Sequence, residues 1–137
     1  MKIIEESVTI ETITKYKDEL FLFNEEMEYL QDKRIIKLID DNGQLIAISM
    51  YTDKMDEQDI ELFLSAEQEK YKDKLCNSIY LDSVYALQPQ CRTVDSIIAY
   101  LKTKCATIWC YSAVDAMSFW TNRKDMQYIG ENIFISY

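Results

Sequence analysis

The sequence predicts an α/β fold of the α+β kind, in which one mixed β-sheet carries helices packed on both faces. Apolar residues make up 48% of the chain, which is far above the content of disordered proteins. Apolar runs typical of strands also alternate with segments of helical spacing, and no repeat or Gly/Pro-rich linker interrupts them. With 137 residues the chain fits one domain, which we place at residues 1–137.

A strand and a helix are expected first. Residues 2–10 alternate loosely and include Val8, Thr9 and Ile10, so they predict a strand. Thr12 can cap the helix that follows. An apolar stripe at steps of three and four residues extends this helix to about residue 30. The members of the stripe are Ile13, Tyr16, Leu20, Phe23, Met27 and Leu30.

The strongest local pattern is a β-hairpin. Two apolar runs, residues 35–39 and 45–51, flank a polar segment that contains Asn42 and Gly43. Because Asn-Gly supplies the positive φ angles of a tight turn, the two runs are expected to pair as antiparallel strands. The charged segment over residues 53–74 then predicts one helix or two short ones.

Strands and helices alternate in the second half of the chain. Residues 78–87 predict a strand that ends just before Pro89, the only proline of the chain. The remaining elements are a helix at 95–104, a buried strand at 106–113, a helix at 115–123 capped by Asp115, and a last strand at 129–137.

Charge and composition exclude several functions. The formal net charge of -9 opposes binding to nucleic acid, and it suits a cationic substrate such as an amine, although solubility alone explains it. No apolar stretch approaches the roughly 18–20 residues of a membrane span, and the N-terminus has no apolar signal core. We therefore expect a cytoplasmic protein. The chain has no histidine, which excludes Ser-His-Asp and Cys-His hydrolases and histidine-based metal sites.

The four cysteines lack the spacing of a metal site. No C-x-x-C pair is present, and a zinc site would need four thiolates from irregular positions. We expect reduced, metal-free thiols, and a metal-thiolate protein is the less favoured alternative. The residues concerned are Cys76, Cys91, Cys105 and Cys110.

Several motifs of the second half resemble the GNAT acetyltransferase superfamily. The family's cofactor strand ends in an apolar residue, any residue, proline, two more residues, and Arg or Gln, and Leu-Gln-Pro-Gln-Cys-Arg at 87–92 matches in place. A later family helix opens with Ala-x-x-Phe-Tyr, and Ala-Met-Ser-Phe-Trp at 116–120 is similar. Residues 128–132 resemble the family's final turn and strand, and the Asn-Gly hairpin would be its central hairpin.

The resemblance implies direct transfer of the acetyl group from acetyl-CoA to an amine, which is a small molecule or a protein amino group. Asp82, the one acid in 78–87, would be the base, and its pKa would be raised on an otherwise apolar strand. An exposed aspartate without this role is the alternative. The family's proton-donating tyrosine is replaced by Trp120, whose indole N–H is not acidic near neutral pH. Tyr111 or Tyr85 would therefore take that role.

The resemblance also implies where the cofactor binds. The family's phosphate loop, R/Q-x-x-G-x-G/A, uses glycines to bring backbone N–H groups to the pyrophosphate. Here the loop is shorter and has no glycine, and Asp95 adds a negative charge near it. Capping of the helix by Thr93 or Asp95 is the alternative role. The implied contacts are Ser83, Val84, Tyr85 and Ala86 with the pantetheine arm, and Arg92, Thr93, Val94, Asp95 and Ser96 with the phosphates.

The altered loop and Trp120 favour a second class of function. This would be a binding or regulatory protein that kept the fold and lost acetyl-CoA binding, with a protein or a small ligand as its partner. A homodimer is also compatible with the sequence.

Overall fold

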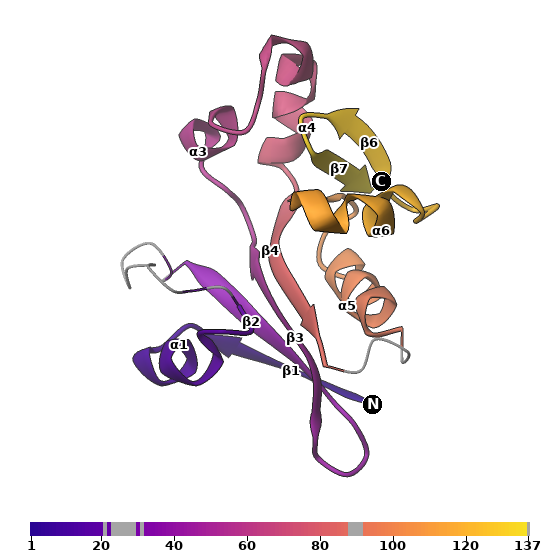
Figure 1. Ribbon diagram of the computed structural model, residues 1–137. Coiled ribbons are helices and arrows are strands. Elements are labelled where there is room, and N and C mark those ends of the chain that lie inside the picture. Colours follow the sequence, from indigo (N-terminus) through magenta and orange to yellow (C-terminus); the bar gives the residue numbers. More distant parts are fainter. Residues whose placement is uncertain (21, 23–29, 31, 88–91, 137) are drawn as a thin grey trace. The chain divides into compact units, whose positions relative to one another are not determined.

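The computed structural model describes residues 1–20, 22, 30, 32–87 and 92–136 (Figure 1). Its strands are β1 (Lys2–Ser7), β2 (Lys33–Ile39), β3 (Leu45–Thr52), β4 (Ile79–Ala86), β5 (Ile108–Tyr111), β6 (Gln127–Gly130) and β7 (Ile133–Ser136). Its helices are α1 (Ile10–Tyr16), α3 (Glu57–Glu61), α4 (Lys72–Cys76), α5 (Thr93–Lys102) and α6 (Met117–Thr121), with short 3₁₀ helices η1 (Ala66–Tyr71) and η3 (Val114–Ala116).

The strands form one mixed sheet of seven strands in the order β1-β2-β3-β4-β5-β7-β6. β4 and β5 are parallel, whereas β1/β2, β2/β3, β5/β7 and β6/β7 pair antiparallel. The predicted α+β fold with a mixed sheet is thereby confirmed. The chain divides into two compact units, unit 1 (Met1–Thr52 and Asp82–Tyr100) and unit 2 (Asp53–Leu81 and Leu101–Tyr137). The single domain expected over residues 1–137 stays a prediction.

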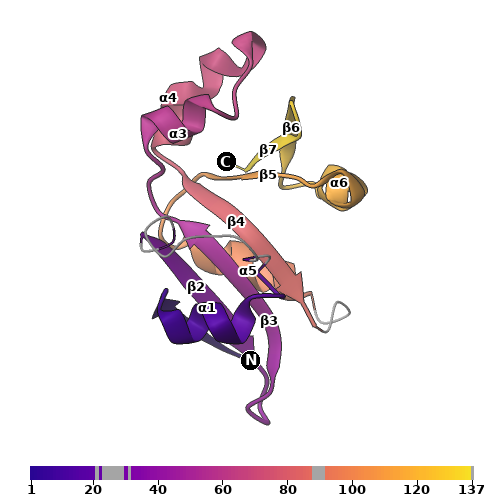
Figure 2. The ribbon, with the colours of Figure 1, turned by 60° about the vertical axis from the view of Figure 1, so that its left-hand side comes forward.

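In unit 1, helices cover both faces of the strands (Figure 2). Tyr16 of α1 belongs to a buried cluster with Ile35 and Met50, so α1 packs on the face that these residues share. Side chains alternate between faces along a strand, which places Glu5 on the face opposite to Glu6. Lys37, whose ammonium lies over the Tyr16 ring, pairs with Glu6 on the α1 face. The hydroxyl of Tyr100 in α5 donates to Glu5, and α5 therefore covers the other face.

The predicted hairpin is confirmed as β2 and β3. Its turn depends on Asp40, whose carboxylate accepts hydrogen bonds from the backbone N–H groups of Asn42 and Gln44, each at 2.9 Å. Gly43 has φ +80°, a left-handed conformation that glycine adopts without steric cost. The Asn-Gly signal therefore works through Gly43 alone, because Asn42 keeps a negative φ.

The first strand and helix meet three residues earlier than expected. Thr9, and not Thr12, is the N-cap: its Oγ1 accepts from the Thr12 N–H at 3.2 Å, and Thr12 Oγ1 accepts from the Thr9 N–H at 2.8 Å. This reciprocal capping box ends β1 at Ser7 and places Ile10 in the helix. Helix α1 ends at Tyr16. The expected stripe positions Phe23 and Met27 lie outside the described residues.

Unit 2 packs around an apolar cluster that includes Trp109, Tyr80 and Ile133. Residues 53–76 form three short helices where one or two were expected. The buried Gln68 side chain connects η1 to β6. Its Oε1 accepts from the N–H of Ser65, the N-cap of η1, at 3.0 Å, and its Nε2 donates to the Ile129 carbonyl of β6 at 3.1 Å.

The expected single strand over residues 129–137 is wrong, because β6 and β7 form a hairpin instead. Its two turn residues, Glu131 and Asn132, have φ +52° and +64°. Gly130 precedes them with φ +97°. The expected capping role of Asp115 is also wrong, since Ala113 is the N-cap of η3 and Asp115 lies within that helix. None of the helices in the described part of the chain is long and apolar enough to cross a membrane.

Candidate functional site

Unit 1 contains most of the expected site residues on two consecutive elements. Asp82–Ala86 form the second part of β4, and Thr93–Ser96 begin α5. Of the motif at 87–92, residues 88–91 lie outside the described residues. Tyr111 belongs to unit 2, where its side chain is 46% exposed on β5.

Asp82 is a buried ion-pair partner. Its Oδ1 contacts the Lys33 ammonium, and its Oδ2 accepts from the Thr52 hydroxyl at 2.8 Å. The Lys33 ammonium also donates to Thr52 Oγ1 at 2.9 Å, which closes a ring of three polar groups. The side chains of Lys33 and Asp82 are only 5% and 9% exposed. The alternative of an exposed strand aspartate is therefore wrong.

Strand register brings this triad together. Lys33 is directly opposite Thr52 in the β2–β3 pair, so both side chains point to the face that α1 covers. The last residue of β3 thus meets Asp82 near the middle of β4. Desolvating two charges is costly, and only a close pair with further hydrogen bonds offsets that cost. Sequence reasoning missed Lys33, because nothing local signals a partner so far away in the chain.

The part of β4 beyond Asp82 is held by β3 on one side. The Ser49 hydroxyl donates to the Ser83 carbonyl at 2.7 Å, and the Leu87 N–H donates to the Ile46 carbonyl at 2.8 Å. Among the described residues, the register of β4 with β5 consists of two pairs, Ile79 with Ile108 and Tyr80 with Trp109. Ser83–Ala86 lie outside these pairs.

The helix expected at residues 95–104 is α5, which begins two residues earlier than expected, at Thr93. Thr93 is 1% exposed, and its hydroxyl has no hydrogen-bond partner in the described part of the chain, so it does not cap the helix. Arg92 is exposed and has φ +51°, which costs a non-glycine residue about 1–2 kcal/mol. Asp95 lies in the first turn and is exposed, not at the N-cap. The first N–H groups of a helix and its dipole favour anions.

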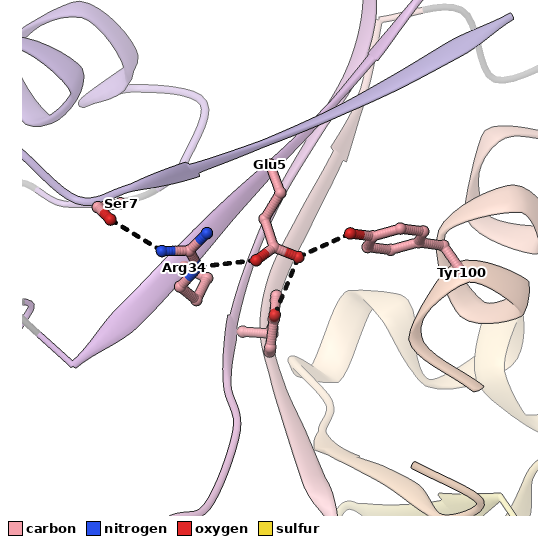
Figure 3. A network of polar contacts seen from close by, with 5 residues as sticks. Glu5, Ser7, Arg34 and Tyr100 are labelled. Carbon is pink, nitrogen blue, oxygen red and sulfur yellow. Dashed lines mark hydrogen bonds and ion pairs between the residues drawn. The ribbon is translucent and has the colours of Figure 1, made fainter. Parts of the chain in front are cut away.

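A second polar network fixes α5 on the sheet of unit 1 (Figure 3). The Glu5 carboxylate accepts from Arg34 Nε at 2.8 Å, from the Tyr51 hydroxyl at 3.0 Å and from the Tyr100 hydroxyl at 2.8 Å. Arg34 also donates to the Ser7 hydroxyl at 2.8 Å. Burial raises the pKa of Tyr51, and the hydrogen bond to Glu5 adds to the effect. The network joins β1, β2, β3 and α5, and no pattern in the sequence indicated it.

The described cysteines are free thiols. Cys76, Cys105 and Cys110 form no disulfide, and burial raises the pKa of Cys110 to about 12. Cys91 lies outside the described residues. In the part of the chain that the structure describes, no three His, Cys, Asp or Glu side chains gather as metal ligands. Four reduced, metal-free thiols therefore stay a prediction.

Comparisons with known proteins identify the fold. No protein-family model matches the chain, and no curated protein matches its sequence. A GNAT-family acetyltransferase from Listeria monocytogenes 4b F2365 has a similar structure, with a TM-score of 0.54 and 8% identity over 98% of this chain and 92% of that chain. A histone acetyltransferase HPA2 and related acetyltransferase from Corynebacterium glutamicum ATCC 13032 has a TM-score of 0.52 and 13% identity over 95% and 87%. The chain therefore has the GNAT acetyltransferase fold.

Proposed function

We propose that the protein is an N-acetyltransferase that moves the acetyl group of acetyl-CoA directly to an amine. The GNAT fold supports this class of reaction. The observation that carries the proposal is the start of α5, where the buried Thr93 hydroxyl has no partner among the described residues. An unsatisfied buried hydroxyl beside the first N–H groups of a helix suits a phosphate oxygen.

The residues at the start of α5 fit a pyrophosphate, except that one of them carries a negative charge. Arg92 offers an exposed guanidinium next to the first N–H groups of α5. Asp95 is exposed in the first turn, where its negative charge opposes an anion. Backbone and side-chain donors of Arg92, Thr93, Val94, Asp95 and Ser96 would hold the phosphates, and the backbone of Ser83, Val84, Tyr85 and Ala86 would hold the pantetheine arm.

Acetyl-CoA supplies the thioester when it binds. Asp82 is the residue proposed to take the proton of the acceptor ammonium, after which the amine can attack. Its ion pair with Lys33 and its hydrogen bond from Thr52 fix the carboxylate in one orientation. Tyr85, 40% exposed on the same strand, is the phenol proposed for the leaving sulfur. The acceptor is a small-molecule amine or a protein amino group.

Calorimetry with acetyl-CoA and with coenzyme A tests the proposal. The wild type should bind both, and Arg92→Gln should weaken binding about 5–150-fold, the equivalent of roughly 1–3 kcal/mol for a charge-assisted hydrogen bond. Asp95→Asn should tighten binding, because it removes the repulsion and keeps the side-chain oxygen. Lys102→Gln, at the other end of α5, is the matched control and should change nothing. Flat titrations of wild type and variants would instead favour a non-catalytic binding protein.

A further inference from the structure

A small cavity opens beside α1 in unit 1. It has a volume of about 200 Å³ and lies between α1 and the strands β1 and β2, where β1 is an edge strand of the sheet. All the residues that line it belong to the stretch Met1–Thr52 of unit 1. They are Glu6, Glu11, Thr12, Lys15, Tyr16 and Lys37.

The cavity is separate from the residues of the proposed transfer reaction. Neither Asp82 nor its partner Lys33 lines it. Lys37 does line it, and Lys37 is four residues from Lys33 on β2, so the Cα atoms of these two lysines are about 13 Å apart along the strand. A role for the cavity is therefore independent of the proposed function.

Two of the four charges in the cavity neutralise each other. The Lys37 ammonium pairs with the Glu6 carboxylate, and this hydrogen bond raises the pKa of Lys37. The Thr12 hydroxyl is also engaged within the protein, because it donates to the Thr9 carbonyl at 2.9 Å in the cap of α1. These groups need no ligand to satisfy them.

The other two charges, those of Glu11 and Lys15, form no ion pair in the part of the chain that the structure describes. Their spacing of four residues is one at which glutamate and lysine often pair on a helix. Instead, the Lys15 ammonium lies over the ring of the buried Tyr16, 5.3 Å from its centroid. The cavity thus presents one carboxylate and one ammonium from neighbouring turns of α1, and its net charge is zero.

We propose that this cavity binds a free α-amino acid in its zwitterionic form. The ammonium of the amino acid pairs with Glu11, and its carboxylate pairs with Lys15. Residues four apart on a helix have Cβ atoms about 5–6 Å apart, so the two protein charges are close enough to meet two ligand charges that one carbon joins. Every charge of the cavity and of the ligand then has a partner.

Size and charge argue against other ligands. Pockets for drug-sized molecules have volumes of about 300–1,000 Å³, so this cavity is too small for a nucleotide or a coenzyme. A simple anion is attracted by Lys15 but repelled by Glu11, and a simple amine meets the opposite repulsion. A small molecule that carries both charges uses both side chains.

A titration followed by heteronuclear NMR tests the inference with three molecules of similar shape. L-Alanine carries both charges, L-lactate has a hydroxyl in place of the ammonium, and L-alaninamide has a carboxamide in place of the carboxylate. Slightly below neutral pH, alanine should shift the backbone amide signals of α1. Lactate and alaninamide should bind at least about fivefold more weakly, because each lacks one charge-assisted hydrogen bond.

Variants of α1 locate the binding site. Glu11→Gln and Lys15→Gln should each weaken alanine binding at least about fivefold. Lys17→Gln is the matched control and should leave binding unchanged, because Lys17 does not line the cavity. All three side chains are exposed, so the variants should fold as the wild type does.

Four outcomes overturn the inference. Alanine may cause no shift of the amide signals, or lactate or alaninamide may bind as tightly as alanine. Alanine may also bind the Glu11→Gln or Lys15→Gln variant with full affinity, which would place it elsewhere. Finally, Lys17→Gln may weaken binding as much as the cavity variants do, which would show only an effect of the overall charge of α1.

Discussion

The buried pair of Lys33 and Asp82 allows a sharp stability prediction. We consider Lys33→Met and Asp82→Asn, separately and together. Each single change leaves one charged side chain buried, at 9% or 5% exposure, without its counter-charge. Removing one partner of such a pair costs about 3–5 kcal/mol in the free energy of unfolding.

The double variant behaves differently because it leaves no uncompensated charge. If the two losses were independent, they would add to about 6–10 kcal/mol, which is most of the stability of a typical domain. We expect the double variant to lie within about 1 kcal/mol of the wild type. The coupling between the two positions is thus expected to be large.

Urea unfolding of the four proteins measures the coupling. Lys37→Met serves as the matched control, because Lys37 has the same side chain on the same strand but pairs with Glu6 at 15% and 32% exposure. Such a partly exposed pair should cost about 1 kcal/mol or less. Additive losses in the double variant, or equal losses in Lys33→Met and Lys37→Met, would refute the reasoning.

Three further outcomes are expected. Gly130→Ala should lower the free energy of unfolding by about 1–3 kcal/mol, since φ is +97° and a Cβ there would be 2.5 Å from Gln68 Nε2; urea unfolding checks this. The folded-state pKa of Tyr51 is raised by burial and by Glu5, so its contribution is present below about pH 10 and is lost as pH rises further. Unfolding midpoints at alkaline pH should therefore fall more steeply in the wild type than in Tyr51→Phe. Burial raises the pKa of Cys110 to about 12, so its thiol should not react with a disulfide reagent near pH 8 until the protein unfolds. A Cys110→Ser variant, which lacks this thiol, shows whether Cys110 is the one that reacts only after unfolding.

Local signals predicted much of unit 1. The hairpin of β2 and β3 needed only two apolar runs and a glycine turn, and the strand before Pro89 needed only its apolar run. The β6–β7 hairpin was missed because its turn residues, Glu131 and Asn132, carry positive φ without a glycine at either position. Thr9 and Thr12 are both good capping residues, and only the reciprocal hydrogen bonds decide between them.

The chemistry of the candidate site was harder to predict. Asp82 could be identified as the one acid of an apolar strand, but its partner Lys33 comes from another strand far away in the chain. From the sequence, a charged residue on β2 is expected to be exposed to solvent. Only the pairing of Lys33 with Thr52 shows that the Lys33 side chain points inward. The hydrogen bond between Glu5 and Tyr100 was missed for the same reason, because most of the chain separates these two residues. Ion pairs of high sequence separation leave no periodic pattern to detect.

Each of the two units consists of two separate stretches of the chain, and this limits the order in which they can fold during synthesis. Unit 1 needs residues Met1–Thr52 and Asp82–Tyr100, so the ribosome must make Asp53–Leu81 of unit 2 before unit 1 is complete. Until β4 emerges, β3 has a neighbour on one side only. Its other edge then exposes unpaired N–H and C=O groups next to apolar side chains, which is a template for wrong pairing. A nascent chain that stalls before Asp82 is therefore the form most in need of a chaperone, and no contiguous gene fragment encodes either unit alone.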